Sequence, residues 1–449
     1  MSTIFPSAFL RSLKEDFNIE GEDLFGSPVT SIRLNPFKPN QNYATEEQVP
    51  WCSTGRYLNE RPSFIADPLF HAGCYYVQEA SSMFLEQALK QTVELNSSLR
   101  ILDLCASPGG KSTLINSLLN DESLLVSNEI IKTRVPPLSD NLTKWGTLNT
   151  FISNNDPRDF ARLEGYFDAL VVDAPCSGSG MFRKDPDTIQ QWSESAVQLC
   201  SQRQQRILAD VYPALKEDGV LIYSTCSYSK QENEVISDWL SDEFGMESLK
   251  LQLDQSWGVQ ETLSDKHQCF GYRFYPNKLK GEGFFIACFR KKESTSEGRF
   301  YKDRLTALNK NVLEIVKGLT NNENNLYFFP VGDEYAAIDS CHSTDLAILQ
   351  AKLYLKKSGV RLGKIAGKDL IPDHELALSL IADPSINKIE LNAAQAISYL
   401  RKDELKLEEQ YPAGWALITY QGYALGWVKV LPNRINNYYP KEIRILKEF

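Results

Sequence analysis

The segment that most constrains the fold of this chain covers residues 169–184 and reads ALVVDAPCSGSGMFRK. Four apolar residues open it, and Asp173, an Ala-Pro pair and a Gly/Ser-rich stretch follow. A short apolar run that ends in turn residues is typical of a buried strand. In open α/β sheets the ligand crevice lies at the carboxyl ends of the strands, so we expect Asp173 and Cys176 at its edge.

The same pattern recurs at residues 220–227, where the apolar run VLIY leads into STCS and places Cys226 at a strand end. Further apolar runs at 101–105, 124–127 and 150–153 alternate with segments of helical spacing. This alternation predicts an α/β fold with a largely parallel sheet that helices cover on both faces. Two thiols and one carboxylate are therefore expected to meet at one edge of the sheet, and either thiol could serve as a nucleophile.

The first of these strands leads into CASPGGK, a glycine-containing turn from Cys105 to Lys111 that opens a helix. A Walker A loop would need glycine where Cys105 stands, and the G-x-G-x-x-G spacing is absent, so no nucleoside triphosphate site is expected. The next two strands end near Glu129 and Asp156. Each acid alone reads as a loop cap, but together they favour an adenosine-like ligand.

Length and composition limit the remaining possibilities. At 449 residues the chain is expected to hold about two to four domains, and the polar residues 291–298 indicate one boundary. The nine cysteines include no C-x-x-C pair, so we predict no metal site and no disulfide framework. No bilayer-spanning apolar stretch or export signal is present, which predicts a cytoplasmic protein with no membrane partner. The net charge of -10 argues mildly against nucleic acid, although a basic strip on an acidic body can still bind it.

Four motifs carry a resemblance to a known family, and the resemblance spans nearly the whole chain. They are ASPGGK at 106–111, NE at 128–129, DAPCSG at 173–178 and STCS at 224–227. In order and in strand-end placement they are similar to the signature of the NOL1/NOP2/Sun RNA cytosine-C5 methyltransferases. The resemblance implies a Rossmann-like class I methyltransferase core that binds S-adenosyl-L-methionine (SAM).

The resemblance also implies four domains. An N-terminal RNA-recognition extension (1–98) precedes the Rossmann-like methyltransferase domain (99–293). A small α+β middle domain (299–369) and a PUA-like β domain (370–449) follow. The PUA-like domain is indicated by GWVK at 426–429 and NYYPK at 437–441, which resemble the tail of bacterial 16S rRNA methyltransferases of this family.

Site residues are assigned one by one from the resemblance. Cys226 is expected to be the nucleophile, as in the Thr-Cys motif of the RNA family, and Cys176 to assist product release. DNA cytosine methyltransferases use the Pro-Cys thiol instead. Lys111 is our candidate for the positive neighbour that favours the thiolate. The expected cofactor residues are Cys105, Ala106, Ser107, Pro108, Gly109, Gly110 and Lys111 around the methionine part, Glu129 at the ribose, Asp156 at the adenine, and Asp173 between cofactor and base. The expected RNA contacts are Arg183, Lys184, Lys429, Arg434 and Lys441.

The function expected from this resemblance is SAM-dependent methylation of cytosine C5 in 16S rRNA, in the decoding region of the 30S subunit, by a monomer. A thiolate that adds at C6 makes C5 nucleophilic, and covalent catalysis thereby divides one difficult step into easier ones. Two alternatives stay open at this point. One is a non-catalytic, SAM-binding ribosome assembly factor, and the other is a DNA cytosine-C5 methyltransferase.

Overall fold

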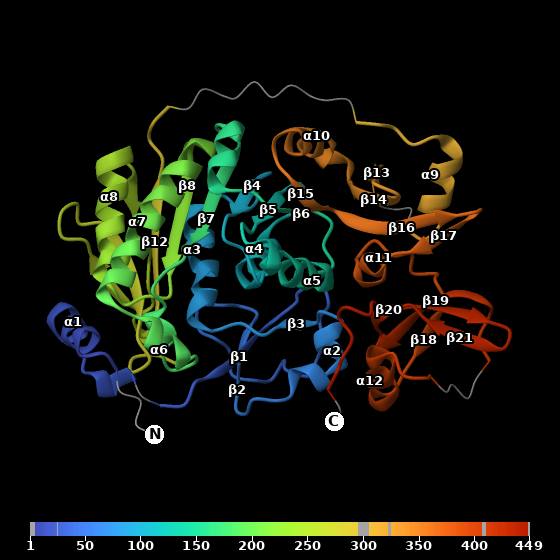
Figure 1. Cartoon of the computed structure of the whole chain (residues 1–449), viewed down its shortest axis with the longest axis horizontal. Coiled ribbons are helices and arrows are strands. Elements are labelled where there is room, and N and C mark those ends of the chain that lie inside the picture. The colour runs from blue at the N-terminus through green and yellow to red at the C-terminus, as the bar shows by residue number, and fades with distance from the viewer. Residues whose placement is uncertain (1–4, 25, 295–304, 322–324, 406–409, 448–449) are drawn as a thin grey trace.

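The computed structural model describes residues 5–24, 26–294, 305–321, 325–405 and 410–447. Within them, a ten-stranded sheet in the order β10-β11-β12-β8-β7-β4-β5-β6-β15 forms the centre, with β9 paired to β12 (Figure 1). The parallel middle strands are β4 (Arg100–Asp103), β5 (Leu124–Asn128), β6 (Thr150–Ser153), β7 (Phe167–Asp173) and β8 (Leu215–Thr225). The antiparallel strands are β9 (Glu247–Leu249), β10 (Gln260–Leu263), β11 (Phe270–Phe274), β12 (Phe284–Arg290) and β15 (Leu355–Ser358).

Helices cover both faces of this sheet because its middle strands are apolar on both sides. Leu170 and Val172 of β7 pack into one hydrophobic core, whereas Val171 packs into another, since successive side chains in a strand point to opposite faces. The helices that contribute to the first core are α7 (Glu194–Val211), α8 (Glu234–Phe244) and α10 (Ser343–Lys352). Those that contribute to the second are α3 (Leu85–Thr92) and α4 (Gly110–Leu118). The predicted α/β fold is confirmed.

One local prediction from the sequence is wrong. The polar residues 216–219, which end in glycine, predict the end of a helix that continues to Leu215. Instead α7 ends at Val211, and β8 already begins at Leu215. The pairing of β7 with β8 shifts in register at this end, and Asp218 adopts a left-handed backbone with φ of 59°. The polar and glycine residues therefore mark an irregular start of a strand.

The N-terminal segment packs against the methyltransferase core through a buried arginine. It contains α1 (Ser7–Phe17), α2 (Pro68–His71) and a sheet of β1 (Thr30–Leu34), β2 (Gly55–Leu58) and β3 (Tyr75–Tyr76). Arg33 of β1 donates hydrogen bonds to Gln78 at 2.8 Å and to Thr113 of α4 at 2.5 Å. Its guanidinium also lies 4.5 Å from the ring of Trp145, the last residue of α5 (Val135–Trp145). The segment is therefore fixed directly to the helices beside the glycine-containing turn.

The C-terminal third forms two further sheets (Figure 1). One contains β13 (Leu326–Val331), β14 (Glu334–Asp339), β16 (Val360–Ala366) and β17 (Asp369–Pro372), next to α9 (Lys310–Lys317) and α11 (His374–Leu378). The other contains β18 (Lys388–Glu390), β19 (Gly414–Tyr420), β20 (Tyr423–Leu431) and β21 (Arg434–Asn437), with α12 (Ala393–Arg401). The apolar runs on either side of the glycine-containing turn at 421–422 have a strand pattern, and they form the pair β19 and β20. Half of the predicted linker, residues 295–298, and the boundary at 299 lie outside the described residues.

Lys38 joins three parts of the chain. Its buried ammonium donates hydrogen bonds to the carbonyl oxygens of Ala72 at 2.9 Å, Lys144 at 2.6 Å and Leu378 at 2.8 Å. These carbonyls lie at the C-terminal ends of α2, α5 and α11, where helix dipoles favour a cation. One side chain thus connects the N-terminal segment, the core and the C-terminal third. In the part of the chain that the structure describes, no helix has the length and apolar character needed to cross a membrane.

Candidate active site

The two strand-end thiols meet at the carboxyl edge of the sheet. Strands β7 and β8 are parallel neighbours, with Asp173 opposite Ser224 in the register. Cys226 follows β8 directly, and Cys176 follows β7 in the next loop. Their Sγ atoms lie 3.2 Å apart, and both are free thiols, as are the other seven cysteines. The predicted convergence of the two side chains is therefore found.

Asp173 and Lys111 form an ion pair beside these thiols. Lys111 Nζ lies 2.7 Å from Asp173 Oδ2, while Asp173 Oδ1 accepts a hydrogen bond from Ser224 Oγ at 2.8 Å. Burial lowers the pKa of Lys111, but the Asp173 carboxylate, with smaller contributions from Asp103 and Cys226, outweighs burial and raises the pKa overall. The ammonium therefore stays charged next to both the carboxylate and the Cys226 thiol.

A pocket of about 430 Å³ opens at this edge of the sheet. Its lining includes most of the glycine-containing turn together with Asp173 and Cys226. Those turn residues are Cys105, Ala106, Ser107, Pro108, Gly110 and Lys111. Gly109 has φ of 110°, which favours glycine, and a Cβ on Gly110 would lie 3.2 Å from the ring of Tyr76. The volume lies within the range of roughly 300–1,000 Å³ that is usual for small-molecule sites.

Glu129 and Asp156 lie at the ends of β5 and β6, the next strands along the sheet. The buried Glu129 accepts a hydrogen bond from the Ile131 amide at 2.8 Å and faces the Arg134 guanidinium at 3.5 Å. Asp156 accepts one from the Arg158 amide at 3.2 Å and caps a short helix. Neither acid lines the 430 Å³ pocket, although Arg134 does. Both acids make cap contacts, and Glu129 is linked to the pocket through Arg134.

Sequence reasoning missed Asp103, at the end of β4. Its Oδ2 accepts a hydrogen bond from Ser112 Oγ at 2.6 Å, and its buried Oδ1 has no hydrogen-bond partner within the described ranges. Burial raises the pKa of this carboxyl to about 7. The sequence does hold a signal for Asp103, because it is an acidic residue at the end of a predicted strand, two residues before Cys105. Tyr76 and Phe284, which come from other segments and line the pocket, had no such signal.

Three family models match successive parts of the chain. Residues 5–80 match the N-terminal domain of 16S rRNA methyltransferase RsmF, residues 90–290 match 16S rRNA methyltransferase RsmB/F, and residues 386–445 match the methyltransferase RsmF PUA domain. The chain is 31% identical over 434 residues to the ribosomal RNA small subunit methyltransferase F of Aeromonas salmonicida, covering 92% of this chain and 90% of the relative. It is 30% identical to the protein of the same name from Escherichia coli, over 98% of this chain and 96% of that one.

The chain belongs to the RsmB/F family of 16S rRNA methyltransferases. Solved structures share its fold. A methyltransferase homologue from Pyrococcus horikoshii is 27% identical, with a TM-score of 0.51 over 60% of this chain and 88% of that one. NSun6 from the same organism, solved with SFG, has a TM-score of 0.54 at 19% identity, over 65% of this chain and 99% of that one.

The cations expected to contact RNA in this RsmB/F-family chain differ in their surroundings. Arg183 is not an exposed cation, because its guanidinium binds the buried Glu282 carboxylate at 3.0 Å and the Gly281 carbonyl at 2.8 Å. It therefore fixes the loop to the start of β12. Lys184, by contrast, is exposed.

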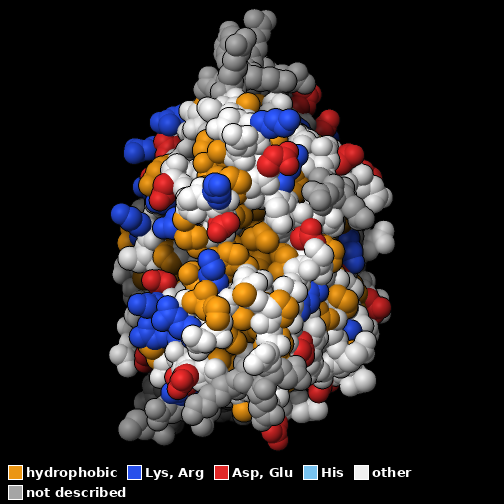
Figure 2. Space-filling model, turned by 90° about the vertical axis from the view of Figure 1, so that its right-hand side faces the viewer, with side chains coloured by type: hydrophobic (Ala, Val, Ile, Leu, Met, Phe, Trp, Pro, Cys, Tyr) orange, Lys and Arg blue, Asp and Glu red, His pale blue; other side chains and the backbone are white. Residues whose placement is uncertain are grey.

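The tail presents its cations at the surface beside aromatic rings. Arg434 and Lys441 are exposed, and Lys429 Nζ lies 5.1 Å from the centre of the Trp415 ring, which packs edge-on against Tyr438 at 4.6 Å. Figure 2 shows the side of the molecule on which the C-terminal sheets lie in Figure 1; hydrophobic side chains gather across it, with Lys and Arg side chains among them. Such a surface suits a partner with phosphates and bases.

Proposed function

We propose that this chain transfers a methyl group from SAM to C5 of a cytosine in 16S rRNA, in the decoding region of the 30S subunit. The observation that carries the proposal is the 3.2 Å approach of Cys176 Sγ to Cys226 Sγ at the ends of two parallel strands. Two thiols beside one carboxylate suit covalent activation of a weakly nucleophilic ring carbon. The names of the curated relatives support small-subunit rRNA as the substrate.

The pocket residues fit SAM, as judged from two features of the site. A Cβ on Gly110 would lie 3.2 Å from the Tyr76 ring, so a side chain there would crowd the wall of the pocket. The buried Asp103 Oδ1, two residues before the turn, has no hydrogen-bond partner among the described residues and can still accept a hydrogen bond. Residues 105–111 would hold the methionine part, Glu129 the ribose and Asp156 the adenine, with Asp173 toward the base. When bound, SAM supplies an electrophilic methyl group.

The chain's own residues activate and release the base. The Cys226 thiolate, favoured by the Lys111 ammonium, forms a bond to C6, and the electron pair of the C5–C6 double bond makes C5 nucleophilic. The Asp173 carboxylate, which is held by Lys111 and Ser224, accepts a hydrogen bond from the N4 amino group at the N3/N4 edge of the ring. After methylation, C5 loses its proton to water, the double bond re-forms, and the electron pair of the C6–sulfur bond returns to Cys226. Cys176 assists this last step.

The target cytosine must leave its stack to reach a pocket of this kind, at a cost of a few kcal/mol. Lys184 next to the thiol loop and Lys429, Arg434 and Lys441 in the tail would hold the flanking phosphates. Aromatic rings such as Trp415 and Tyr438 add sequence-tolerant stacking.

Bisulfite sequencing of 16S rRNA from cells with and without the gene tests this function. We expect one or more decoding-region cytosines to resist conversion only when the gene is present, and to lose this resistance in a Cys226→Ala strain. SAM binding without label transfer to any RNA would favour an assembly factor instead. Transfer to duplex DNA in preference to rRNA would favour a DNA methyltransferase.

A further inference from the structure

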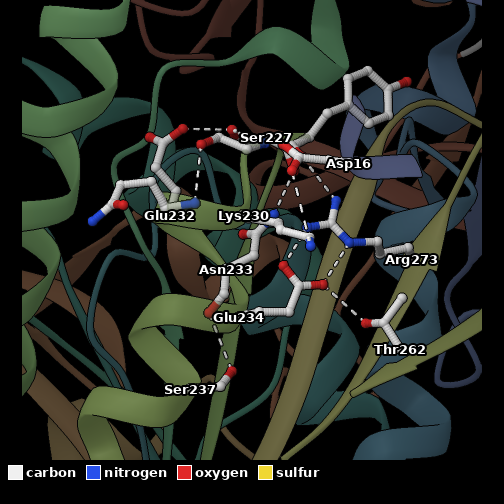
Figure 3. Close-up of polar contacts among 12 residues, drawn as sticks. Asp16, Ser227, Lys230, Glu232, Asn233, Glu234, Ser237, Thr262 and Arg273 are labelled. Atoms are coloured by element: carbon white, nitrogen blue, oxygen red, sulfur yellow. Dashed lines mark hydrogen bonds and ion pairs between the residues drawn. The ribbon is translucent and has the colours of Figure 1, made fainter. Parts of the chain in front are cut away.

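The buried carboxylate of Glu232 contacts the residues that directly follow the two thiols. Glu232 belongs to the short helical turn Lys230–Glu232 that follows β8, and it is fully buried. It accepts hydrogen bonds from the Ser177 amide at 2.7 Å, Ser177 Oγ at 2.6 Å and Ser227 Oγ at 2.5 Å. Ser177 directly follows Cys176, and Ser227 directly follows Cys226. One carboxylate thus binds both thiol-bearing loops, and Figure 3 shows how Glu232 and Ser227 lie.

Backbone contacts keep the same two loops together. The Gly180 amide donates to the Cys226 carbonyl at 2.8 Å, and the Tyr228 amide donates to Ser179 Oγ at 2.9 Å. A Cβ on Gly180 would lie only 2.8 Å from the Cys226 carbonyl oxygen, so the approach of the loops needs glycine there. The distance between the two Sγ atoms is therefore set by the loops and by the carboxylate that joins them.

The two thiols have different charged neighbours. Lys111 lies close enough to Cys226 for the thiol to help raise the lysine's pKa. The pKa of Cys176 is raised well above its usual range, first by the hydrogen bond with Cys226 and burial, and then by the negative charges of Cys226 and Glu232. The Gly178 amide opposes this shift, and Tyr223, another titratable neighbour, has its own pKa raised well above 10 by burial. Burial also raises the pKa of Glu232 itself, against the hydrogen bonds from Ser177 and Ser227. The Glu232 charge thus lies near Cys176, whereas the Lys111–Asp173 ion pair lies near Cys226.

We propose that Glu232 is a positioning residue that ties the two thiol-bearing loops together and keeps Cys176 in its protonated form. The inference rests on the proposed function. As the C6–sulfur bond breaks, its electron pair returns to Cys226, and the Cys176 S–H donates a hydrogen bond to the departing sulfur. Without the Glu232 charge, Cys176 loses its proton at a lower pH and repels the thiolate that it should stabilise.

Glu234, two residues further on, offers a matched control. Its carboxylate binds Arg273 Nε at 2.7 Å and Thr262 Oγ1 at 2.9 Å (Figure 3), and among the described residues no hydrogen bond joins it to either thiol loop. Glu232→Gln and Glu234→Gln remove one buried negative charge each with little change in volume. A purely structural role predicts similar effects for both, whereas the proposed role predicts an effect on Cys176 for Glu232 alone.

The experiment is alkylation of the intact protein by iodoacetamide at several fixed pH values up to about pH 10, with Cys176 and Cys226 peptides quantified by mass spectrometry. Only the thiolate reacts, so the alkylation rate of each thiol reports its thiolate fraction at that pH. At each pH we expect Cys176 in Glu232→Gln to react on the order of tenfold faster than in the wild type, as a pKa lower by about one unit requires. Glu234→Gln should keep the wild-type rate even if its melting temperature falls further. An unchanged Cys176 alkylation rate in folded Glu232→Gln overturns the proposal.

Two further measurements keep the test decisive. If Glu232→Gln does not fold, Glu232→Asp, which retracts the charge, should raise the Cys176 alkylation rate by a smaller factor, and an unchanged rate again overturns the proposal. With 16S rRNA and SAM, Glu232→Gln should accumulate covalent protein–RNA adduct at a lower pH than the wild type. If Cys176→Ala forms no adduct while the change in alkylation rate persists, the covalent function fails and the electrostatic role of Glu232 stands.

Discussion

Charged side chains are paired and largely buried around the pocket, whereas several in the PUA-like tail are exposed. At the pocket, Lys111 pairs with Asp173, and its side chain is only 13% exposed, while Arg183 pairs with Glu282 and is 11% exposed. In the tail, Arg434 and Lys441 stand exposed at the surface. Paired, buried charges have fixed positions and suit the stabilisation of a reacting group, whereas exposed cations suit the attraction of phosphates. We infer that chemistry resides in the core and much of the RNA affinity in the tail.

The largest expected effect tests the core side of this comparison. Cys226→Ala should lower methyl transfer by on the order of 10³-fold or more, because no other residue replaces the covalent step. The dissociation constant for RNA should stay within about twofold of the wild type, since the tail cations are untouched. Transfer of labelled methyl groups and filter binding measure the two quantities. Cys341→Ala, at an exposed thiol, is the control, and near-normal transfer by Cys226→Ala would refute the role of the thiol.

Lys111→Met sharpens the comparison because it removes a cation from the core without touching the tail. Asp173 loses its 2.7 Å partner, and the reacting thiol loses a neighbouring positive charge. We expect the turnover number to fall by about 10²-fold, because the carboxylate that contacts the base is no longer held in place. Binding of RNA should change little. A turnover number within about twofold of the wild-type value would show that Lys111 contributes nothing to the chemistry.

Much of the core was predictable because its signals are local. The runs at 169–172 and 220–223 are apolar on both faces, and parallel neighbours bring their ends to one edge, so the meeting of Cys176 and Cys226 follows from the strand pattern alone. Polar strand β10 lacks such a pattern, and its place is fixed only by pairing with β11. The partners of Arg183 and Lys38 lie 99 and up to 340 residues away, a separation that no local pattern encodes.

Lys38→Met tests how much the side chain that connects the N-terminal segment, the core and the C-terminal third contributes to stability. Three buried carbonyl oxygens at helix ends lose their donor, and we expect the free energy of unfolding to fall by about 2–4 kcal/mol. Denaturant unfolding measures this loss, with Lys352→Met, at an exposed lysine, as the control. Transfer to a short RNA should survive, because the pocket does not include Lys38. Equal free energies of unfolding of the two variants would show that the three hydrogen bonds of Lys38 contribute nothing to stability.

The smallest expected effect concerns the tail. Replacing Lys429 and Lys441 together with alanine should weaken RNA binding by about tenfold. The slope of the logarithm of the binding constant against the logarithm of the salt concentration should become shallower, as expected when about one to two phosphate contacts are lost. The turnover number at saturating RNA should stay at the wild-type value. Lys388→Ala, at an exposed lysine of β18, serves as the control. A fall in turnover with unchanged affinity would reverse the division of labour between tail and core.

The most direct test of the central claim is a denaturing gel of protein incubated with 16S rRNA and SAM. If Cys226 attacks the base and Cys176 assists its release, Cys176→Ala should accumulate a covalent protein–RNA band, and Cys226→Ala and the double variant should show none. A band in Cys226→Ala that is missing in Cys176→Ala would exchange the two roles. Absence of a band in all three variants would contradict covalent catalysis by this thiol pair.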